Sequence, residues 1–252
     1  MALDTHALLS PDQKKITSQK KIISILRKLL LSRQLTVIQT FVSRVTNKNG
    51  GCTVPLISNE FKCLPYLKCR EHFMPMSNGD IKGKGYHFTH TVTDGLRAGG
   101  LWLVMQDDSG QTAGNSGDII MFAAIEDVDW LSGSQIKLKL AIRHWGKVTP
   151  AGMQHQQLEG QVYPLWQDSY LPSDDVLVMR LIQCTNEFHN SELNNATVPL
   201  STTHFNTNWI CWRWLEILPI PLDKKQRLLK YPTSKLCLRY LKKIIRQSDR
   251  IK

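Results

Sequence analysis

The side chains best suited to metal chemistry lie between positions 52 and 90. Thiolates and imidazoles are the ligands that Zn²⁺ prefers, and four of them can enclose the ion tetrahedrally. The candidates are Cys52, Cys63, Cys69 and His72, with His87 and His90 further along the chain. Their spacings are loose and no Cys-x₂₋₄-Cys pair occurs, so reduced thiols without a metal are the preferred interpretation. In the strand expected here, His87 and His90 would point to opposite faces, which also disfavours joint ligation.

Signatures of catalysis are missing from the sequence. The Gly-Lys dipeptides at 83–84 and 146–147 are followed by Gly and Val, so neither completes a phosphate-binding G-x-x-x-x-G-K-[ST] loop. No H-E-x-x-H motif and no G-x-S-x-G elbow occur. The acidic pairs Asp107-Asp108 and Asp174-Asp175 suit a turn and a helix start, respectively. We therefore expect no catalytic, cofactor-binding or metal-binding residues and no enzyme activity.

Tryptophans suggest a binding role instead. Around 207–218, apolar residues recur at helical spacing, which predicts a buried helix face that contains Trp214. Trp209 falls on the same face as Arg213 and Glu216, and Trp212 borders it. An exposed aromatic there could contact an unfolded peptide. The alternative, which the pattern favours, is that Trp209 packs under the preceding loop. Trp209 and Trp212 are the candidate substrate-binding residues.

Three regions must position these side chains: 1–50, 52–171 and 172–252. Residues 1–50 have a basic amphipathic pattern that predicts a helix, which we expect to pack on the next region rather than on a membrane. From 52 to 171 the apolar residues alternate, as in "SQIKLKLAIRHW" (134–145), or form short continuous runs at 101–106 and 118–125. Residues 85–92, "GYHFTHTV", also alternate. Gly-rich spacers between these segments predict several short strands joined by hairpin loops.

The last region is predicted to be helical. Ser173-Asp174-Asp175 begins one helix, and a polar loop follows at about 186–203. Pro219 and Pro221 end the Trp-rich helix because proline lacks an N–H group and restricts the residue before it. Asp223 and Gln226 have the spacing of a capping box for the next helix. Pro232 ends that helix, and a final helix is predicted to bury Leu238, Leu241 and Ile245.

The charge of the chain is concentrated at its ends. The formal charge is +11 over 252 residues. Residues 1–50 carry nine Lys and Arg against two Asp, a charge of +7, and residues 223–252 carry eleven against two, a charge of +9. The middle therefore carries −5, which disfavours phosphate-backbone binding by the β region. Six scattered cysteines and no apolar run of about 18 residues predict a reduced, soluble, cytoplasmic protein.

One stretch of sequence carries a family resemblance. "RWLEILPIPLDKKQRLL" (213–229) resembles the closing signature of the Lon-protease N-terminal domain family. The segment from "LWLVMQDDSG" to "LKLAIRHWGKV" is similar to that family's β core in order and spacing. The family's opening Pro-Leu-Phe-Pro-Leu is only echoed at 54–67, and its Leu-Arg-Ile-Phe-Glu-Pro-Arg-Tyr segment is missing. The first strands therefore depart from the family pattern.

The resemblance implies an α+β fold. We expect a PUA-like β-barrel at 52–171, a helical bundle at 172–252 and an extra N-terminal amphipathic helix. It also implies a stand-alone, non-catalytic module that binds unfolded or specific polypeptides, without the ATPase and protease domains of a complete Lon enzyme. A second hypothesis is RNA binding, because PUA-like barrels occur in RNA-binding modules and the basic C-terminal helices could contact phosphates.

Overall fold

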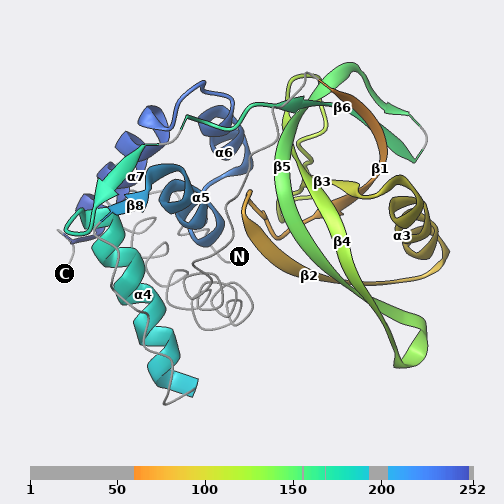
Figure 1. Ribbon diagram of the computed structural model, residues 1–252, viewed down its shortest axis with the longest axis horizontal. Coiled ribbons are helices and arrows are strands. Elements are labelled where there is room, and N and C mark those ends of the chain that lie inside the picture. Colours follow the sequence, from red (N-terminus) through yellow and green to blue (C-terminus); the bar gives the residue numbers. More distant parts are fainter. Residues whose placement is uncertain (1–59, 155, 168, 193–203, 250–252) are drawn as a thin grey trace, which may run out of the picture.

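The computed structural model describes residues 60–154, 156–167, 169–192 and 204–249, and they form a mixed α+β fold (Figure 1). The predicted helix at 1–50 and Cys52 lie outside the described residues. The β half contains β1 (Phe61–Cys69), β2 (Ser77–Lys84), α3 (Tyr86–Ala98), β3 (Leu101–Met105), β4 (Ile119–Leu131), β5 (Gln135–Gln154) and β6 (Gln157–Tyr163). The helical half contains β7 (Tyr170–Pro172), α4 (Val176–Glu192), β8 (His204–Asn206), α5 (Thr207–Ile217), α6 (Leu222–Leu229) and α7 (Lys235–Asp249).

Five strands of the β half pair in a closed ring, β5-β4-β3-β1-β6, and β2 pairs with β5 only. The sheet order is β2-β5-β4-β3-β1-β6, and the 20-residue β5 pairs with β6 as well as with β4 and β2. All of these pairs are antiparallel except β1 with β3. Strand β1 closes the ring between β3 and β6, although its sequence departs from the family pattern. The predicted strands around 101–106, 118–125 and 136–142 are confirmed as β3, β4 and β5.

Residues 85–92, predicted as a strand, instead form the N-cap and first turns of helix α3. Gly85 has φ 91° and ψ 166° at the N-cap, a backbone conformation that favours glycine and separates β2 from the helix. Thr91, Val92 and Gly95 are buried at helical spacing. His87 and His90 are thus three positions apart on a helix, which overturns the argument that they point to opposite faces of a strand.

The two halves share one core. A continuous apolar cluster joins buried residues of β3, β4 and β5 to helices α4–α7. A smaller cluster around Trp102 takes buried residues from β1, β3, β4, β5 and β6. A Cβ atom at Gly146 or Gly160 would lie 2.7 Å or 2.8 Å from the indole of Trp102. These two glycines therefore leave the space that the buried indole occupies.

The predicted order of the C-terminal helices is confirmed. Asp175 accepts a hydrogen bond from the Leu177 N–H at 3.0 Å and caps α4, as the sequence indicates. The Asn206 side chain caps α5 by accepting from the N–H groups of Asn208 and Trp209. The predicted capping box of α6 does not form, because Pro221 is the N-cap and no side chain bonds to it. No helix within the described ranges is long and apolar enough to cross a membrane.

Candidate polypeptide-binding surface

The two predicted binding residues lie at different depths. Trp212 is 1% exposed, so in this conformation its side chain offers no surface to a partner. Trp209 is partly buried against the shared core, and the guanidinium carbon of Arg213 lies 5.6 Å from the centre of its ring. The face that Trp209 shares with Arg213 is therefore largely covered, and the predicted packing of Trp214 in the core is confirmed.

Trp212 belongs to a buried aromatic cluster with Trp145 and Trp166. Trp212 stacks on Trp166 with ring centres 6.1 Å apart, and both rings meet Trp145 edge-on. The indole N–H of Trp166 donates to the Tyr231 carbonyl, and that of Trp145 donates to the Pro164 carbonyl. Because these rings come from β5, α5 and the segment between β6 and β7, the cluster joins the two halves.

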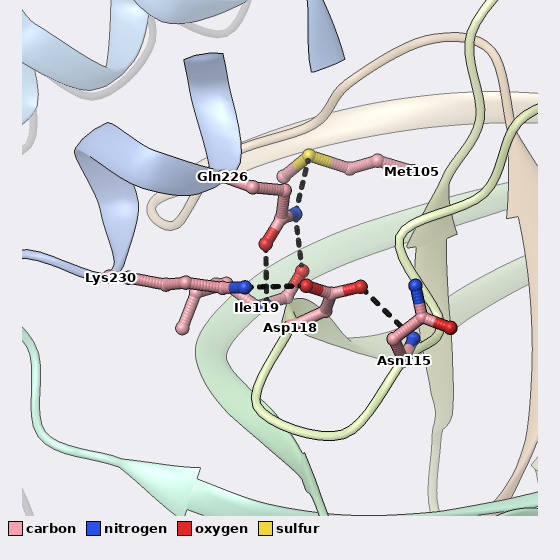
Figure 2. Close-up of polar contacts among 6 residues, drawn as sticks. All are labelled: Met105, Asn115, Asp118, Ile119, Gln226 and Lys230. Atoms are coloured by element: carbon pink, nitrogen blue, oxygen red, sulfur yellow. Dashed lines mark hydrogen bonds and ion pairs between the residues drawn. The ribbon is translucent and has the colours of Figure 1, made fainter. Parts of the chain in front are cut away.

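A polar junction joins α6 to strand β4 (Figure 2). The Gln226 side chain accepts from the Ile119 N–H at 2.7 Å and donates to the Ile119 carbonyl at 2.9 Å. Its amide nitrogen also lies 3.6 Å from the Met105 sulfur. Nearby, the ammonium of Lys230 contacts Asp118 at 2.6 Å. The Asp118 carboxylate also accepts from the Asn115 N–H, which fixes the loop before β4.

A second junction is buried between α5, α6 and the segment that connects β1 to β2. Glu216 accepts from the Met74 N–H at 2.7 Å and pairs with the Arg213 guanidinium at 3.1 Å. Arg213 also donates to the Pro75 carbonyl at 3.0 Å. Both charged side chains are almost fully buried. These contacts hold the 74–75 backbone against α5.

Lys225 and His72 extend this second junction. The Lys225 ammonium lies 3.2 Å from His72 Nδ1, and His72 Nε2 lies 3.0 Å from the Gln106 carbonyl oxygen. A carbonyl can only accept, so Nε2 carries the proton and Nδ1 accepts from Lys225. Burial, together with the charge of Lys225, lowers the pKa of His72 to about 4. Burial lowers the pKa of Lys225 to about 8, against the opposing effect of Glu216.

The candidate zinc ligands are dispersed. The Cys63 thiol is exposed and contacts the Gln157 side chain, whereas Cys69 is buried, and burial raises its pKa to about 12. His72 contacts Lys225, and His90 Nδ1 lies 2.9 Å from an Asp94 carboxylate oxygen on α3. No three potential ligands come together within the described part of the chain, and Cys52 lies outside it.

A large exposed apolar side chain sits at the tip of the β4–β5 hairpin. Trp130 is 70% exposed, and its neighbour Leu131 is also exposed. The hairpin extends away from helices α4–α7, with α3 beside it (Figure 1). Strand β3 pairs with β4 only as far as Ala123, so beyond that residue β4 pairs with β5 alone. Trp130 and Leu131 therefore lie on a strand that has no neighbouring strand on its other edge.

The pairing of β4, β5 and β2 places Trp130 at the end of a row of residues that lie opposite one another on these three strands. Trp130 pairs with Ile136, which pairs with Gly83 of β2. Phe88 of α3 packs over Gly83, since a Cβ atom there would lie only 2.4 Å from its ring. Residues opposite one another on neighbouring strands share a face, so Phe88 covers the inner part of the row and Trp130 continues it into solvent.

The next row adds two exposed apolar side chains to the same end of the sheet. Leu131 pairs with Gln135, which pairs with Lys84. Tyr86, 75% exposed, begins α3 two residues after Lys84. Leu131 follows Trp130 directly in β4, so the two side chains project to opposite sides of the hairpin. We call Trp130, Leu131 and Tyr86, which together surround this end of the hairpin, the hairpin-tip surface. Its rim is polar, with Lys82, Lys84 and the ion pair of Lys137 with Asp80. Apolar residues with a charged rim are typical of protein-binding surfaces.

The sequence contains an indication of this surface in the alternation of apolar residues before the turn at 132–134, although the Trp-rich helix was the segment interpreted as a binding site. Val128 and Trp130 are two positions apart and so continue the alternating face of a strand up to the turn at 132–134. The exposure of Trp130 depends on how far each neighbouring strand extends, and this is a property of tertiary pairing.

Comparison with known proteins gives structural neighbours but no relatives in sequence. No family model matches the sequence, and no curated protein matches it. The chain is similar in structure to Lon N-terminal domains. One is a Lon N-terminal domain protein from Xanthomonas campestris, with 17% identity and a TM-score of 0.49, covering 71% of this chain and 96% of that one. The other is the N-terminal domain of Mycobacterium avium complex Lon protease, with 12% identity and a TM-score of 0.49, covering 73% and 98%. A likeness at this level identifies neither a binding site nor a partner.

Proposed function

We propose that this protein is a non-catalytic module that binds polypeptide segments through the hairpin-tip surface. The observation that carries the proposal is the 70% exposure of Trp130, whose cross-strand partner Ile136 is fully buried. Desolvating a tryptophan and its apolar neighbours is a large source of binding free energy, and tryptophan is enriched among residues that dominate protein interfaces.

The sequence resemblance to Lon N-terminal domains supports the same proposal. The stretch "RWLEILPIPLDKKQRLL" carries that resemblance, and its side chains Arg213, Glu216 and Gln226 hold the helical half against the β half. These residues therefore have a structural role, and the binding surface lies elsewhere. A rigid joint between the halves would present the hairpin at a fixed angle.

The proposal predicts binding that depends on apolar contact. A fluorescein-labelled, reduced and carboxymethylated lactalbumin, which stays unfolded, is titrated with the full chain and followed by anisotropy. Replacing Trp130 with Ser should weaken binding about tenfold, because one desolvated aromatic side chain contributes about 1–2 kcal/mol or more. Raising the salt concentration should change the affinity little.

Tyr170 provides the matched control. It is also a strongly exposed aromatic residue, 66% exposed, but it lies on β7 in the helical half. Tyr170→Ser should leave the affinity unchanged. Equal losses for the two variants, or no loss for Trp130→Ser, would show that the hairpin-tip surface is not the binding site.

A further inference from the structure

The outer face of α7 carries only basic side chains over three turns. Cys237, Leu241 and Ile245 are buried against the core. Every exposed position from 235 to 246 is basic, namely Lys235, Arg239, Lys243 and Arg246. At 100° per residue these four fall within an arc of about 80° around the helix. We call them the α7 basic face.

These charges are not neutralised by the rest of the described structure. None of the four has a carboxylate of the described residues within ion-pair distance, whereas Lys242, at the flank of the face, pairs with Asp175. In the β half, by comparison, Lys137 pairs with Asp80 and Lys139 with Asp127, at 2.8 Å and 2.9 Å. The α7 basic face is therefore a row of four exposed positive charges on one side of a single helix.

The clustering of positive charges on this face destabilises α7 when no anion is bound to it. Lys235, Arg239 and Lys243 follow one another at i, i+4 spacing, where like charges repel by about 0.2–0.5 kcal/mol per pair. Lys235 also stands in the first turn, where the helix dipole disfavours a positive charge. A polyanion laid along the face would convert this repulsion into attraction.

The geometry of the face selects among polyanions. The four charges extend along about 16 Å of helix axis at 1.5 Å per residue. Duplex nucleic acid carries one negative charge per about 1.7 Å of its axis, so a matching length presents several phosphates to the face. A membrane-surface helix would need exposed apolar residues beside the basic ones, and no large apolar side chain on α7 is exposed. Single strands are bound on exposed aromatic platforms, which the α7 basic face lacks.

We propose that the α7 basic face binds the phosphate backbone of duplex nucleic acid without reading its sequence. This inference is independent of polypeptide binding, because the hairpin-tip surface lies on the other half of the molecule.

The test is fluorescence anisotropy of a labelled, blunt-ended RNA duplex of arbitrary sequence with the full chain, at about 50 mM and about 200 mM KCl. The double variant Arg239→Gln/Lys243→Gln removes two exposed charges. It should weaken binding at least tenfold at the lower salt concentration. It should also reduce the slope of log affinity against log salt by about 2, since each phosphate contact contributes about 0.9.

Lys82→Gln/Lys84→Gln is the matched control, because it removes the same charge from exposed positions on β2. This control should bind like the unmodified protein. Equal losses in the two variants, or no duplex binding at the lower salt concentration, would overturn the proposal. So would tighter binding to a single strand of the same length, or binding to phosphatidylserine vesicles in place of the duplex. Circular dichroism melting of each variant verifies that it is folded.

Discussion

Gln226 on α6 occupies the place of a strand partner for Ile119 on β4. The register of β3 with β4 runs through Leu103 opposite Met121, and its continuation would place Met105 opposite Ile119. The chain leaves that register, and the Gln226 amide bonds to both the N–H and the carbonyl of Ile119 instead. A side-chain amide has one acceptor and two donor hydrogens, so it can satisfy both backbone groups at once.

Gln226→Ala should therefore destabilise the fold by about 3 kcal/mol, because two buried backbone groups lose their partners. The free energy of unfolding is measured by urea denaturation. Gln247→Ala, at an exposed position near the end of α7, is the control and should change it by less than about 0.5 kcal/mol. Similar losses for the two variants would contradict the role assigned to the Gln226 amide.

The buried pair of Arg213 and Glu216 predicts strong thermodynamic coupling. Removing one partner leaves a buried charge uncompensated, which costs about 3–5 kcal/mol, whereas removing both costs less than the sum. A double-mutant cycle with Arg213→Met and Glu216→Gln, measured by chemical denaturation, should give a coupling energy above about 1.5 kcal/mol. Additive effects would indicate that the two charges are independently stabilised.

His72 predicts a stability that decreases in mild acid. Its pKa is lowered from 6.5 to about 4 by burial and by Lys225, so between these values the unfolded chain binds the proton and the folded chain does not. The contribution of neutral His72 to the free energy of unfolding is fully present above pH 6.5 and is lost as the pH falls towards 4. Allowing for the partial exposure of the ring, it amounts to about 2 kcal/mol.

This pH dependence is measured as a difference between proteins, because Glu216 also titrates abnormally, its pKa being raised by burial. Unfolding free energies of the unmodified protein and of His72→Gln are compared from pH 7 to pH 4. The unmodified protein should lose more stability than the variant over this range. Parallel curves would show that His72 titrates normally in the folded protein.

The sequence predicted the helical half well because its signals are local. Asp175, Pro219 and Pro221 mark element ends through the backbone of their immediate neighbours, and the structure confirms those boundaries. Helix α3 was missed because the eight residues 85–92, with Thr89 and Thr91 among them, fit a period of two as well as a helix. The positive φ of Gly85, which begins the helix, has no unambiguous sequence signature.

The role of Gln226 could not be predicted for a different reason. Its spacing from Asp223 suggested a capping box, but its partner Ile119 lies 107 residues away in the sequence. The exposure of Trp130 similarly depends on where β3 stops pairing with β4. Burial of Trp212 follows from its contacts with Trp145 and Trp166, which come from separate parts of the chain. Contacts between residues so far apart in the sequence can be identified only from the three-dimensional structure.

Site-specific photocrosslinking tests the proposed function most directly. Benzoylphenylalanine replaces Leu131 in the hairpin-tip surface or, in a second protein, the exposed Met179 on α4. Each full-length protein is irradiated with the same labelled, unfolded lactalbumin. Position 131 should give a crosslinked product that unlabelled lactalbumin competes away, and position 179 should give little product. Crosslinking from position 179 with none from position 131 would contradict the proposed function.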